Sequence, residues 1–389
     1  MQEIDKALIS EMKIKLTFIF LLILIIPALV VAKASAESHP DVRVAIVQGV
    51  ETINLKVTGA YEVTNPSKSK VLYQGRILIT TVTSYRAGIL IGEKSFNADW
   101  ILIVGKGDSL IFINGRTFRG EILIIRENNG MLTAVNRIGL EDYIRGILYN
   151  EASHYWPMEA LKAQAIVSRT YAVYSMQQNK FKAFDVTNDV YSQVYGGSKS
   201  ERFRTNQAVD ETLGKVIVFE GKIIPAYFHA TCGGHTEDAS LLWKINIPPL
   251  KGVVCGFCKD SPHFNWHEVI FTGDLRQDLV DAGYHIGVIK NIIPTGKDES
   301  GRIRDLLIIN KKNDLIISAK DFRNIIGPNL IRSTNFNVSV IGTDAVFEGI
   351  GWGHGVGLCQ WGAYFMAKNG STAEQIIRYY YPKTDVKTF

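Results

Sequence analysis

The sequence predicts a mixed α+β fold in which a β-rich N-terminal part is followed by a helix-containing core. Runs of β-branched residues broken by Gly, Asn and Asp dominate residues 41 to about 136. Apolar residues then recur at helical spacing from about residue 139. The chain has 389 residues, 46% of them apolar and 21% charged, which is ordinary globular composition and long enough for two lobes.

The N-terminal segment resembles a secretory signal. Lys13 and Lys15 precede an apolar run over residues 16–32, and the small-x-small pattern Ala34-Ser35-Ala36 follows. This order predicts a signal peptide over residues 1–36 that is cut after Ala36. The alternative is an uncleaved membrane anchor, which is marginal because the run has 17 residues and contains Pro27. We therefore expect the mature protein to work outside the cytoplasmic membrane.

The charge pattern excludes one class of partner. The net charge is +5 and the isoelectric point is about 8.8, which is mild for this length. No dense block of Lys and Arg is present in the sequence. We therefore expect no nucleic-acid partner.

The β-rich part is expected to span residues 37–136. Strands are predicted at residues 42–47, 76–82, 108–115 and 120–128, and Asn129-Gly130 predicts a hairpin turn after the last of them. No group of residues in this part suggests catalysis, so we interpret it as a scaffold.

An acidic residue interrupts the apolar face of the first predicted helix. Leu140, Ile144, Ile147 and Leu148 lie on one helical face, and the same spacing places Glu151 on it. A carboxylate on an apolar face is costly when charged, so its pKa rises and it stays protonated closer to neutral pH. That protonation state is the one a general acid needs. The alternative is a helix-end glutamate that reaches solvent or pairs with a nearby arginine.

Further helices and strands follow. Pro157 suits the first position of a helix that runs to about Gln178 and is rich in alanine. Two strands are predicted at residues 215–219 and 223–229, and residues 268–347 carry helices and strands with few chemical signals. Near the C-terminus, residues 371–374 (Ser-Thr-Ala-Glu) predict a capping box that opens the last helix.

Cysteines and histidines cluster between residues 229 and 267. The best ligand set for a structural zinc ion is Cys232, Cys255, Cys258 and one histidine, with His263 preferred over His235. The alternative is a disulfide, which an oxidising compartment would favour. Three thiolates would leave the zinc a weak Lewis acid, so we expect no cofactor for catalysis.

A glycine-rich stretch lies between residues 349 and 362. It contains six glycines but neither a Walker lysine nor the dinucleotide-binding pattern. Glycines at this density let a backbone approach a ligand closely, and His354, Gln360 and Trp361 could contact a sugar-like substrate. The alternative is a tight turn between a strand and a helix.

Three long blocks of the sequence are similar to one known family. They are "LEDYIRGILYNEASHYWPMEALKAQAIVSRTYAVY", "YFHATCGGHTEDASLLW" and "GWGHGVGLCQWGAYFMAKNGSTAEQIIRYYYPKT", and "SQVYGG" at residues 192–197 also fits. With these blocks the chain resembles the stage II sporulation protein D/amidase-enhancer family of bacterial cell-wall proteins. One departure is "NEASHYWP", where many relatives have a more compact stretch. The resemblance does not imply that the organism sporulates.

The resemblance implies lytic transglycosylase activity on peptidoglycan glycan strands, especially strands stripped of stem peptides. The family's catalytic glutamate falls on Glu151, the residue that the helical face had already singled out. The family pattern also points to Lys162, Gln164 and Arg169 as residues of a substrate groove, and we assign Tyr195, His354 and Gln360 to the same groove. Residues 137–389 are then the catalytic core, which includes the Cys/His loop at residues 229–267.

Two other classes of function stay open at this stage. The first is a non-enzymatic module that binds peptidoglycan or activates a cell-wall amidase partner. The second is a zinc hydrolase that uses His229 and His235. In each case the expected location is the cell wall or the periplasm, with membrane contact only through an uncleaved N-terminal segment.

Overall fold

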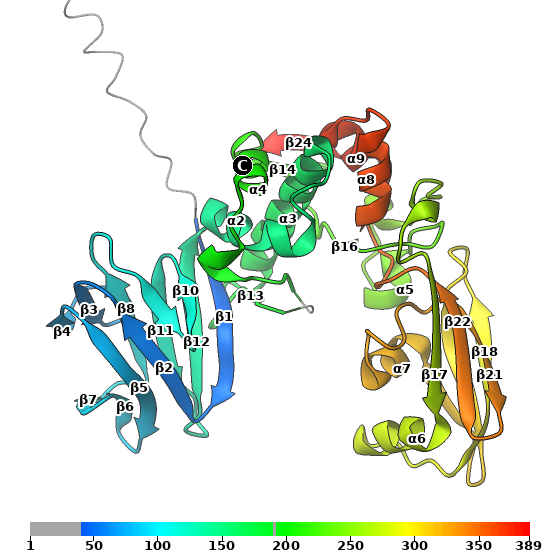
Figure 1. Ribbon diagram of the computed structural model, residues 1–389, viewed down its shortest axis with the longest axis horizontal. Coiled ribbons are helices and arrows are strands. Elements are labelled where there is room, and N and C mark those ends of the chain that lie inside the picture. The colour runs from blue at the N-terminus through cyan, green and yellow to red at the C-terminus, as the bar shows by residue number, and fades with distance from the viewer. Residues whose placement is uncertain (1–39, 190–191) are drawn as a thin grey trace, which may run out of the picture. The chain divides into compact units, whose positions relative to one another are not determined.

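The computed structural model describes residues 40–189 and 192–389 (Figure 1). The predicted signal peptide and its cleavage point lie outside these residues. Within the described ranges, no helix has the length and apolar character needed to cross a membrane. The mixed α+β class and the β-rich N-terminal part are confirmed.

The β-rich part forms two sheets. The larger has the order β13-β1-β12-β11-β8-β3-β4, with all pairs antiparallel except β13 and β1. Its strands are β1 (Asp41–Val50), β3 (Tyr61–Thr64), β4 (Val71–Gly75), β8 (Trp100–Gly105), β11 (Glu121–Arg126), β12 (Leu132–Gly139) and β13 (Val186–Thr187). The smaller has the order β10-β9-β2-β5-β6-β7. Its strands are β2 (Thr52–Val57), β5 (Leu78–Tyr85), β6 (Gly88–Ile91), β7 (Lys94–Phe96), β9 (Ile111–Ile113) and β10 (Arg116–Phe118).

Alternation along the strands divides the apolar side chains between two faces. Ile101 and Ile103 of β8 join a core shared with the smaller sheet, whereas Leu102 between them joins a separate cluster on the other face. The predicted hairpin at Asn129-Gly130 connects β11 to β12, and Gly130 has a φ of 82°, a conformation that glycine adopts without strain.

Six helices of the described residues pack against two apolar cores, one of them shared with the sheets. They are α2 (Leu140–Glu151), α3 (Met158–Gln178), α4 (Phe203–Asp210), α5 (Ala239–Trp243), α8 (Gln360–Lys368) and α9 (Ala373–Tyr380). Helix α3 lies between two apolar cores: Leu161 and Ala165 pack into the first, and Ala163 and Ile166 into the second. Its alanines allow helices and strands to approach it from both sides.

Short strands complete this region. They are β14 (Lys215–Phe219), β15 (Lys222–Ile223), β16 (Phe228–His229), β23 (Leu358–Cys359) and β24 (Asp385–Thr388). The single strand predicted at residues 223–229 is divided into β15 and β16, and Pro225, which lacks a backbone N–H, lies between them. The predicted capping box is displaced by one residue, because Thr372 is the N-cap of α9 and Gln375 is its partner.

Residues 265–350 form a segment with its own apolar core, which we call the inserted segment. In the sequence, the inserted segment lies between β16 and β23. These two strands pair with each other in parallel. Helices α6 and α7 lie on one side of its strands (Figure 1). Its elements are β17 (Asn265–Phe271), α6 (Thr272–Asp281), β18 (Ile289–Lys297), β19 (Ile303–Asn310), β20 (Leu315–Ser318), α7 (Ala319–Ile326), β21 (Phe336–Ile341) and β22 (Asp344–Ile350).

A buried ion pair joins α2 to α3. Arg169 has a fully buried side chain and donates two hydrogen bonds to Glu141, at 2.8 and 2.7 Å. It also donates to the carbonyl of Lys215 in β14, at 3.1 Å. Because both charges are removed from water, the pair depends on both partners being present.

Replacement of Arg169 by Met should destabilise the protein by about 3–5 kcal/mol, because it leaves the Glu141 carboxylate buried without a counter-charge. Urea unfolding at pH 7 measures this loss. The control is Arg145→Met, which removes a more exposed arginine that pairs with Asp142 and Asp210 and should cost below about 1 kcal/mol. Equal losses for the two variants would contradict the structural role given to Arg169.

Candidate functional site

Glu151 is the last residue of α2. The four apolar residues that predicted its position are fully buried on the same helix. The helix ends because Ala152 adopts an extended conformation (φ −143°, ψ 133°), and α3 starts after Pro157. One oxygen of the Glu151 carboxyl group, Oε1, accepts a hydrogen bond of 2.9 Å from the backbone N–H of Val194.

Two glutamines support Glu151 from behind. The side chain of Gln360, at the start of α8, donates to the backbone carbonyl of Glu151 at 3.1 Å. It also lies 3.4 Å from Oε1 of Gln164 in α3, whose own amide donates to Ser168 at 3.1 Å. Three helices therefore meet at Glu151 through the amide side chains of Gln360 and Gln164.

The surroundings of Glu151 raise its pKa to about 7. Removal of the carboxyl group from water is the largest cause, because desolvation disfavours the charged form. The hydrogen bonds from Val194 and Gln360 oppose this shift. At such a pKa, a substantial fraction of the Glu151 carboxyl group is protonated near neutral pH.

A cavity of about 470 Å³ adjoins Glu151. Its lining comes from the α2–α3 region, from β16 and the chain after it, from the glycine-rich stretch and from the inserted segment. Aromatic side chains contribute to it, namely Tyr171, Tyr227, Phe228, Trp243 and Trp352. Among the described residues that line it, Glu151 is the only carboxylic acid. The cavity can therefore hold a ligand against one protonatable group and several apolar rings.

Two neutral histidines line the same cavity. Burial lowers the pKa of His229 to about 3, with a smaller effect from the charge of Arg302, and burial also lowers the pKa of His354. Nδ1 of His354 accepts from the backbone N–H of Val356 at 3.1 Å, and Nδ1 of His229 lies 3.1 Å from the carbonyl of Val356. Nε2 of His229 is buried and has no hydrogen-bond partner among the described residues. As a neutral imidazole, His229 can accept a hydrogen bond from a ligand.

The structure brings together part of the predicted groove. Glu151, His354 and Gln360 line the cavity, and Gln164 lies behind them. His229, which the sequence suggested only as a zinc ligand, belongs to the same lining.

The other three predicted groove residues are not among the described residues that line this cavity, and each contacts other parts of the protein. Lys162 forms ion pairs with Glu159 and Glu211 at 2.9 and 2.6 Å. Arg169 forms the buried ion pair with Glu141 described above. Tyr195 is 1% exposed and donates to Asn136 at 2.7 Å. Polar side chains that form hydrogen bonds or ion pairs with each other inside the protein have the same sequence pattern as residues that line a groove. The sequence alone therefore does not distinguish the two.

Four cysteines form a second cluster of chemical interest. The Sγ atoms of Cys232, Cys255, Cys258 and Cys359 all lie within 4.8 Å of one another, and all four residues are buried and free of disulfides. Cys359 therefore takes the fourth place that the spacing had given to His263. The ring of His263 packs instead against Trp352, with centroids 4.8 Å apart. The sequence missed Cys359 because it lies about a hundred residues after the other three.

The donor set fits a structural zinc ion. Four sulfurs at a Zn–S distance of about 2.3 Å in a tetrahedron lie about 3.8 Å apart, which matches a cluster of this size. Sγ of Cys359 accepts hydrogen bonds of 3.3 Å from the backbone N–H groups of Cys232 and Gly362, as thiolate ligands commonly do. A bound zinc ion would join three distant parts of the chain. No other group of three or more His, Cys, Asp or Glu ligand atoms comes together in the described ranges, so a hydrolytic zinc site at His229 and His235 has no support.

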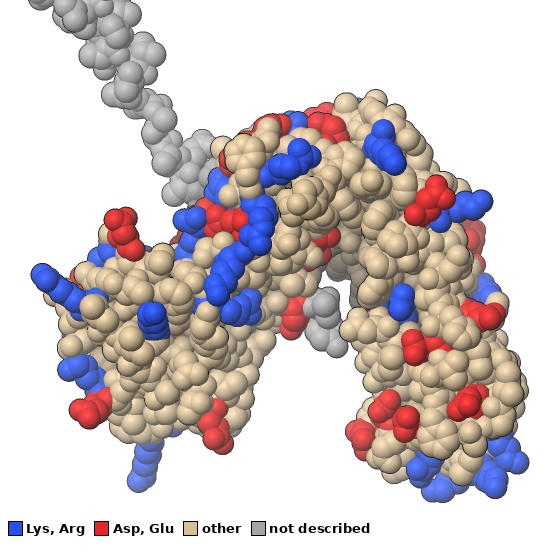
Figure 2. Space-filling model, viewed as in Figure 1, with Lys and Arg blue, Asp and Glu red and all other residues tan. Residues whose placement is uncertain are grey.

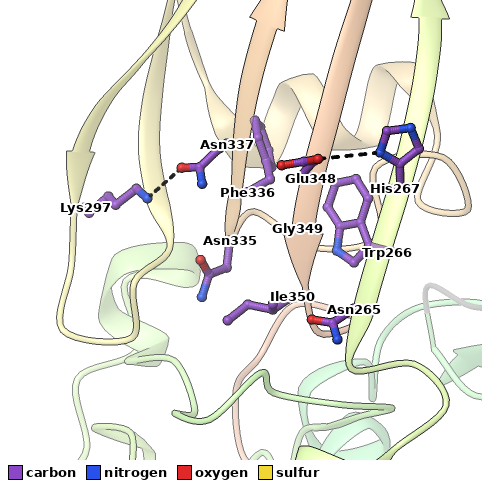
Figure 3. A pocket seen from close by; sticks show the side chains of 10 residues that line it. All are labelled: Asn265, Trp266, His267, Lys297, Asn335, Phe336, Asn337, Glu348, Gly349 and Ile350. Atoms are coloured by element: carbon purple, nitrogen blue, oxygen red, sulfur yellow. Dashed lines mark hydrogen bonds and ion pairs between the residues drawn. The ribbon is translucent and has the colours of Figure 1, made fainter.

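A second cavity, of about 530 Å³, lies on the inserted segment (Figure 3). Its polar lining includes Asn265, Asn335 and Asn337, and His267 lies 4.0 Å from Glu348. The side chains of His267 and Glu348 are 59% and 74% exposed, so solvent screens this pair. Without a buried acid, this cavity is a weaker candidate for catalysis than the cavity at Glu151.

Comparison with known proteins identifies the family. A family model described as "Stage II sporulation protein" matches residues 128–219, which include Glu151. A stage II sporulation protein D from Bacillus amyloliquefaciens is 30% identical over 268 residues, which cover 65% of this chain and 75% of that protein. The chain belongs to the stage II sporulation protein D/amidase-enhancer family. The resemblance stated from the sequence is thereby confirmed.

Other comparisons extend this finding. An uncharacterized protein from Brachyspira hyodysenteriae is 34% identical over 347 residues, which cover 89% of this chain and 92% of that protein. The protein named amidase enhancer in Bacillus subtilis is 26% identical over 294 residues, covering 63% of this chain and 40% of that protein. A domain of unknown function, DUF8618, matches residues 254–357 and so includes the inserted segment.

Replacement of Cys359 by Ser should abolish zinc binding, because a three-thiolate site lacks its fourth buried ligand. The purified wild type should contain about one zinc ion per chain. Loss of the ion should lower the melting temperature by on the order of 10 °C, because the ion stabilises only the folded state. Metal analysis by mass spectrometry and a thermal melt check both statements.

The matched control is His263→Ala, which should keep the zinc. Loss of zinc from His263→Ala together with its retention by Cys359→Ser would restore the ligand set predicted from spacing and contradict the cluster.

Proposed function

We propose that this protein is a peptidoglycan lytic transglycosylase that cleaves the glycosidic bond between N-acetylmuramic acid and N-acetylglucosamine, preferably in peptide-stripped strands. Family membership supports a function related to the cell wall. The observation that carries the specific proposal is the carboxyl group of Glu151, whose pKa is raised to about 7 beside a cavity of sugar-accommodating size. The proposed location is outside the cytoplasmic membrane.

In the proposed first step, Glu151 acts as a general acid. Its proton passes to the glycosidic oxygen as the bond from that oxygen to C1 of the muramic sugar breaks, and N-acetylglucosamine leaves with a free hydroxyl group. The muramic sugar acquires oxocarbenium character. The raised pKa favours this step, because a protonated acid must be present at the operating pH.

In the second step, Glu151 acts as a base. It removes the proton from the 6-hydroxyl group of the same sugar, whose oxygen attacks C1 and closes a 1,6-anhydro ring. The carboxyl group is then protonated again, so no water and no second carboxylate take part. The absence of another carboxylic acid from the described lining agrees with this chemistry. An ordinary glycosidase would need two carboxylates.

The other residues of the cavity would bind and orient the sugar. His229 would accept a hydrogen bond from a hydroxyl or acetamido N–H group through Nε2, and the aromatic side chains would pack against sugar rings. Gln360 and Gln164 would keep Glu151 in place. The four cysteines would hold a structural zinc ion, whose positive charge would stabilise the buried thiolates. This ion would take no part in the reaction.

The alternative is a non-enzymatic module that binds glycan or activates an amidase partner. The relative named amidase enhancer supports this alternative. In such a module Glu151 would serve only as a hydrogen-bonding group for the sugar.

Glu151→Gln should lower turnover by about 10²–10⁴-fold and leave glycan binding nearly unchanged, because the amide keeps the shape but cannot transfer the proton. Mass spectrometry of peptidoglycan digests, with native and amidase-treated substrate, should show anhydro-muramic products from the wild type only. Gln164→Asn tests the supporting layer and should reduce turnover less. If neither substrate gives products while binding is intact, the module is the better description.

The rate constant kcat/KM should fall above about pH 7, by up to tenfold per pH unit. The reason is that Glu151 must be protonated in the free enzyme, and its raised pKa sets the midpoint of that loss. Initial rates between pH 5 and 9 on a soluble glycan oligomer measure the profile. A profile that rises through pH 7 would show that the carboxylate, and not the acid, is needed first.

A further inference from the structure

One wall of the Glu151 cavity is built by α7 of the inserted segment. Lys320, Arg323 and Asn324 occupy positions i, i+3 and i+4, so they share one face of the helix, and all three line the cavity. The opposite face packs into the core of the inserted segment through Ala319, Phe322 and Ile326. Asn329, just after the helix, extends the polar wall. The helix is thus amphipathic, and its polar side belongs to the cavity.

Hydrogen bonds hold the two cations of α7 in position. Lys320 donates from Nζ to the carbonyl of Leu242 at 3.3 Å, which ties α7 to the end of α5. Arg323 donates from Nε to the carbonyl of Arg332 at 3.3 Å. The charge of Arg323 also contributes to the lowered pKa of His354, so this guanidinium acts on the interior of the cavity.

The inserted segment is fixed to the core by Arg302. This buried arginine donates to the carbonyls of Cys232 and Gly353, each at 3.2 Å. It also lies 3.9 Å from Glu237. The anchor connects the inserted segment to the cysteine cluster and to the glycine-rich stretch that carries His354. The inserted segment that carries α7 is therefore attached to the core through a buried side chain.

The charge of the cavity is positive. Lys320 and Arg323 face a lining whose only acid among the described residues is Glu151, and the raised pKa of Glu151 reduces its negative charge near neutral pH. A neutral sugar polymer would not need two cations there. A polymer that carries a carboxylate on its sugar units would be attracted to them.

We propose that the inserted segment, matched by a domain of unknown function, is the acid-recognition wall of the cleft, in which Lys320 and Arg323 bind a sugar-borne carboxylate and Asn324 and Asn329 bind its neighbouring polar groups. This inference rests on the proposed function and assigns the specificity of the same site. In a muramic glycan, the group with this chemistry is the lactyl carboxylate, which is free when no peptide is attached. The wall would therefore position the muramic sugar next to Glu151.

The test measures binding in the Glu151→Gln background, so that no turnover interferes. The probes are a peptide-free muramic oligosaccharide and the same oligosaccharide with its lactyl carboxylates converted to methyl amides. Calorimetry should show roughly tenfold or tighter binding of the acidic probe, and a difference that shrinks as salt rises. Adding Lys320→Gln and Arg323→Gln should remove this preference, so that the two probes bind equally, and circular dichroism should show that the variant is folded.

The matched control adds Lys290→Gln and Arg304→Gln, which remove the same charges from exposed positions of β18 and β19. This control should keep the preference for the acidic probe. Equal binding of the two probes to Glu151→Gln alone, binding of neither, or an effect of the control as large as that of the α7 variant would overturn the proposal. Charge-dependent binding by a wild type that forms no anhydro product would support the wall and reject only the transglycosylase.

Discussion

The carboxyl group of Glu151 ends a helix that is otherwise buried, and its desolvation determines how the rest of the site must be built. Among the described residues, one backbone N–H, that of Val194, donates to the carboxyl oxygen. The amide side chain of Gln360, which also contacts Gln164, donates to the backbone carbonyl of Glu151 without supplying a positive charge. A lysine or arginine beside Glu151 would have lowered its pKa and stabilised the carboxylate. Arg169 of α3 is paired with Glu141 in the interior, and the causes of the Glu151 pKa shift include no basic side chain.

The second constraint is that residues distant in sequence must converge on this acid. Gln360 and His354 lie about two hundred residues after Glu151, and the four-cysteine cluster lies next to the chain that carries them. Cys359 directly precedes Gln360. The interactions that fix the thiol group of Cys359 therefore also fix the position of the Gln360 side chain. Arg302 connects the same cluster to the inserted segment. The cysteine cluster thus connects the chain that carries Gln360 with the inserted segment.

The sequence predicted most of the fold class and the central acid, but only part of the cavity. Helical periodicity was sufficient to place Glu151, because α2 is short, regular and buried on one side. Periodicity could not separate Lys162, Arg169 and Tyr195 from true cavity residues, because burial in an ion pair or hydrogen bond depends on partners elsewhere in the chain. Cys359 was missed for the same reason: its partners are close in space and not in sequence. The contribution of α7 left no local signal, because a cationic helix face looks like an ordinary solvated face until the cavity is known.

The most direct test of the account is digestion of peptidoglycan in water enriched in oxygen-18, followed by mass spectrometry of the new muramic ends. The single-carboxylate mechanism predicts anhydro ends that contain no oxygen-18, because the 6-hydroxyl group of the sugar and not water attacks C1. Reducing ends that carry one oxygen-18 atom would show that water is the nucleophile. That result would contradict the single-carboxylate mechanism and require a second base.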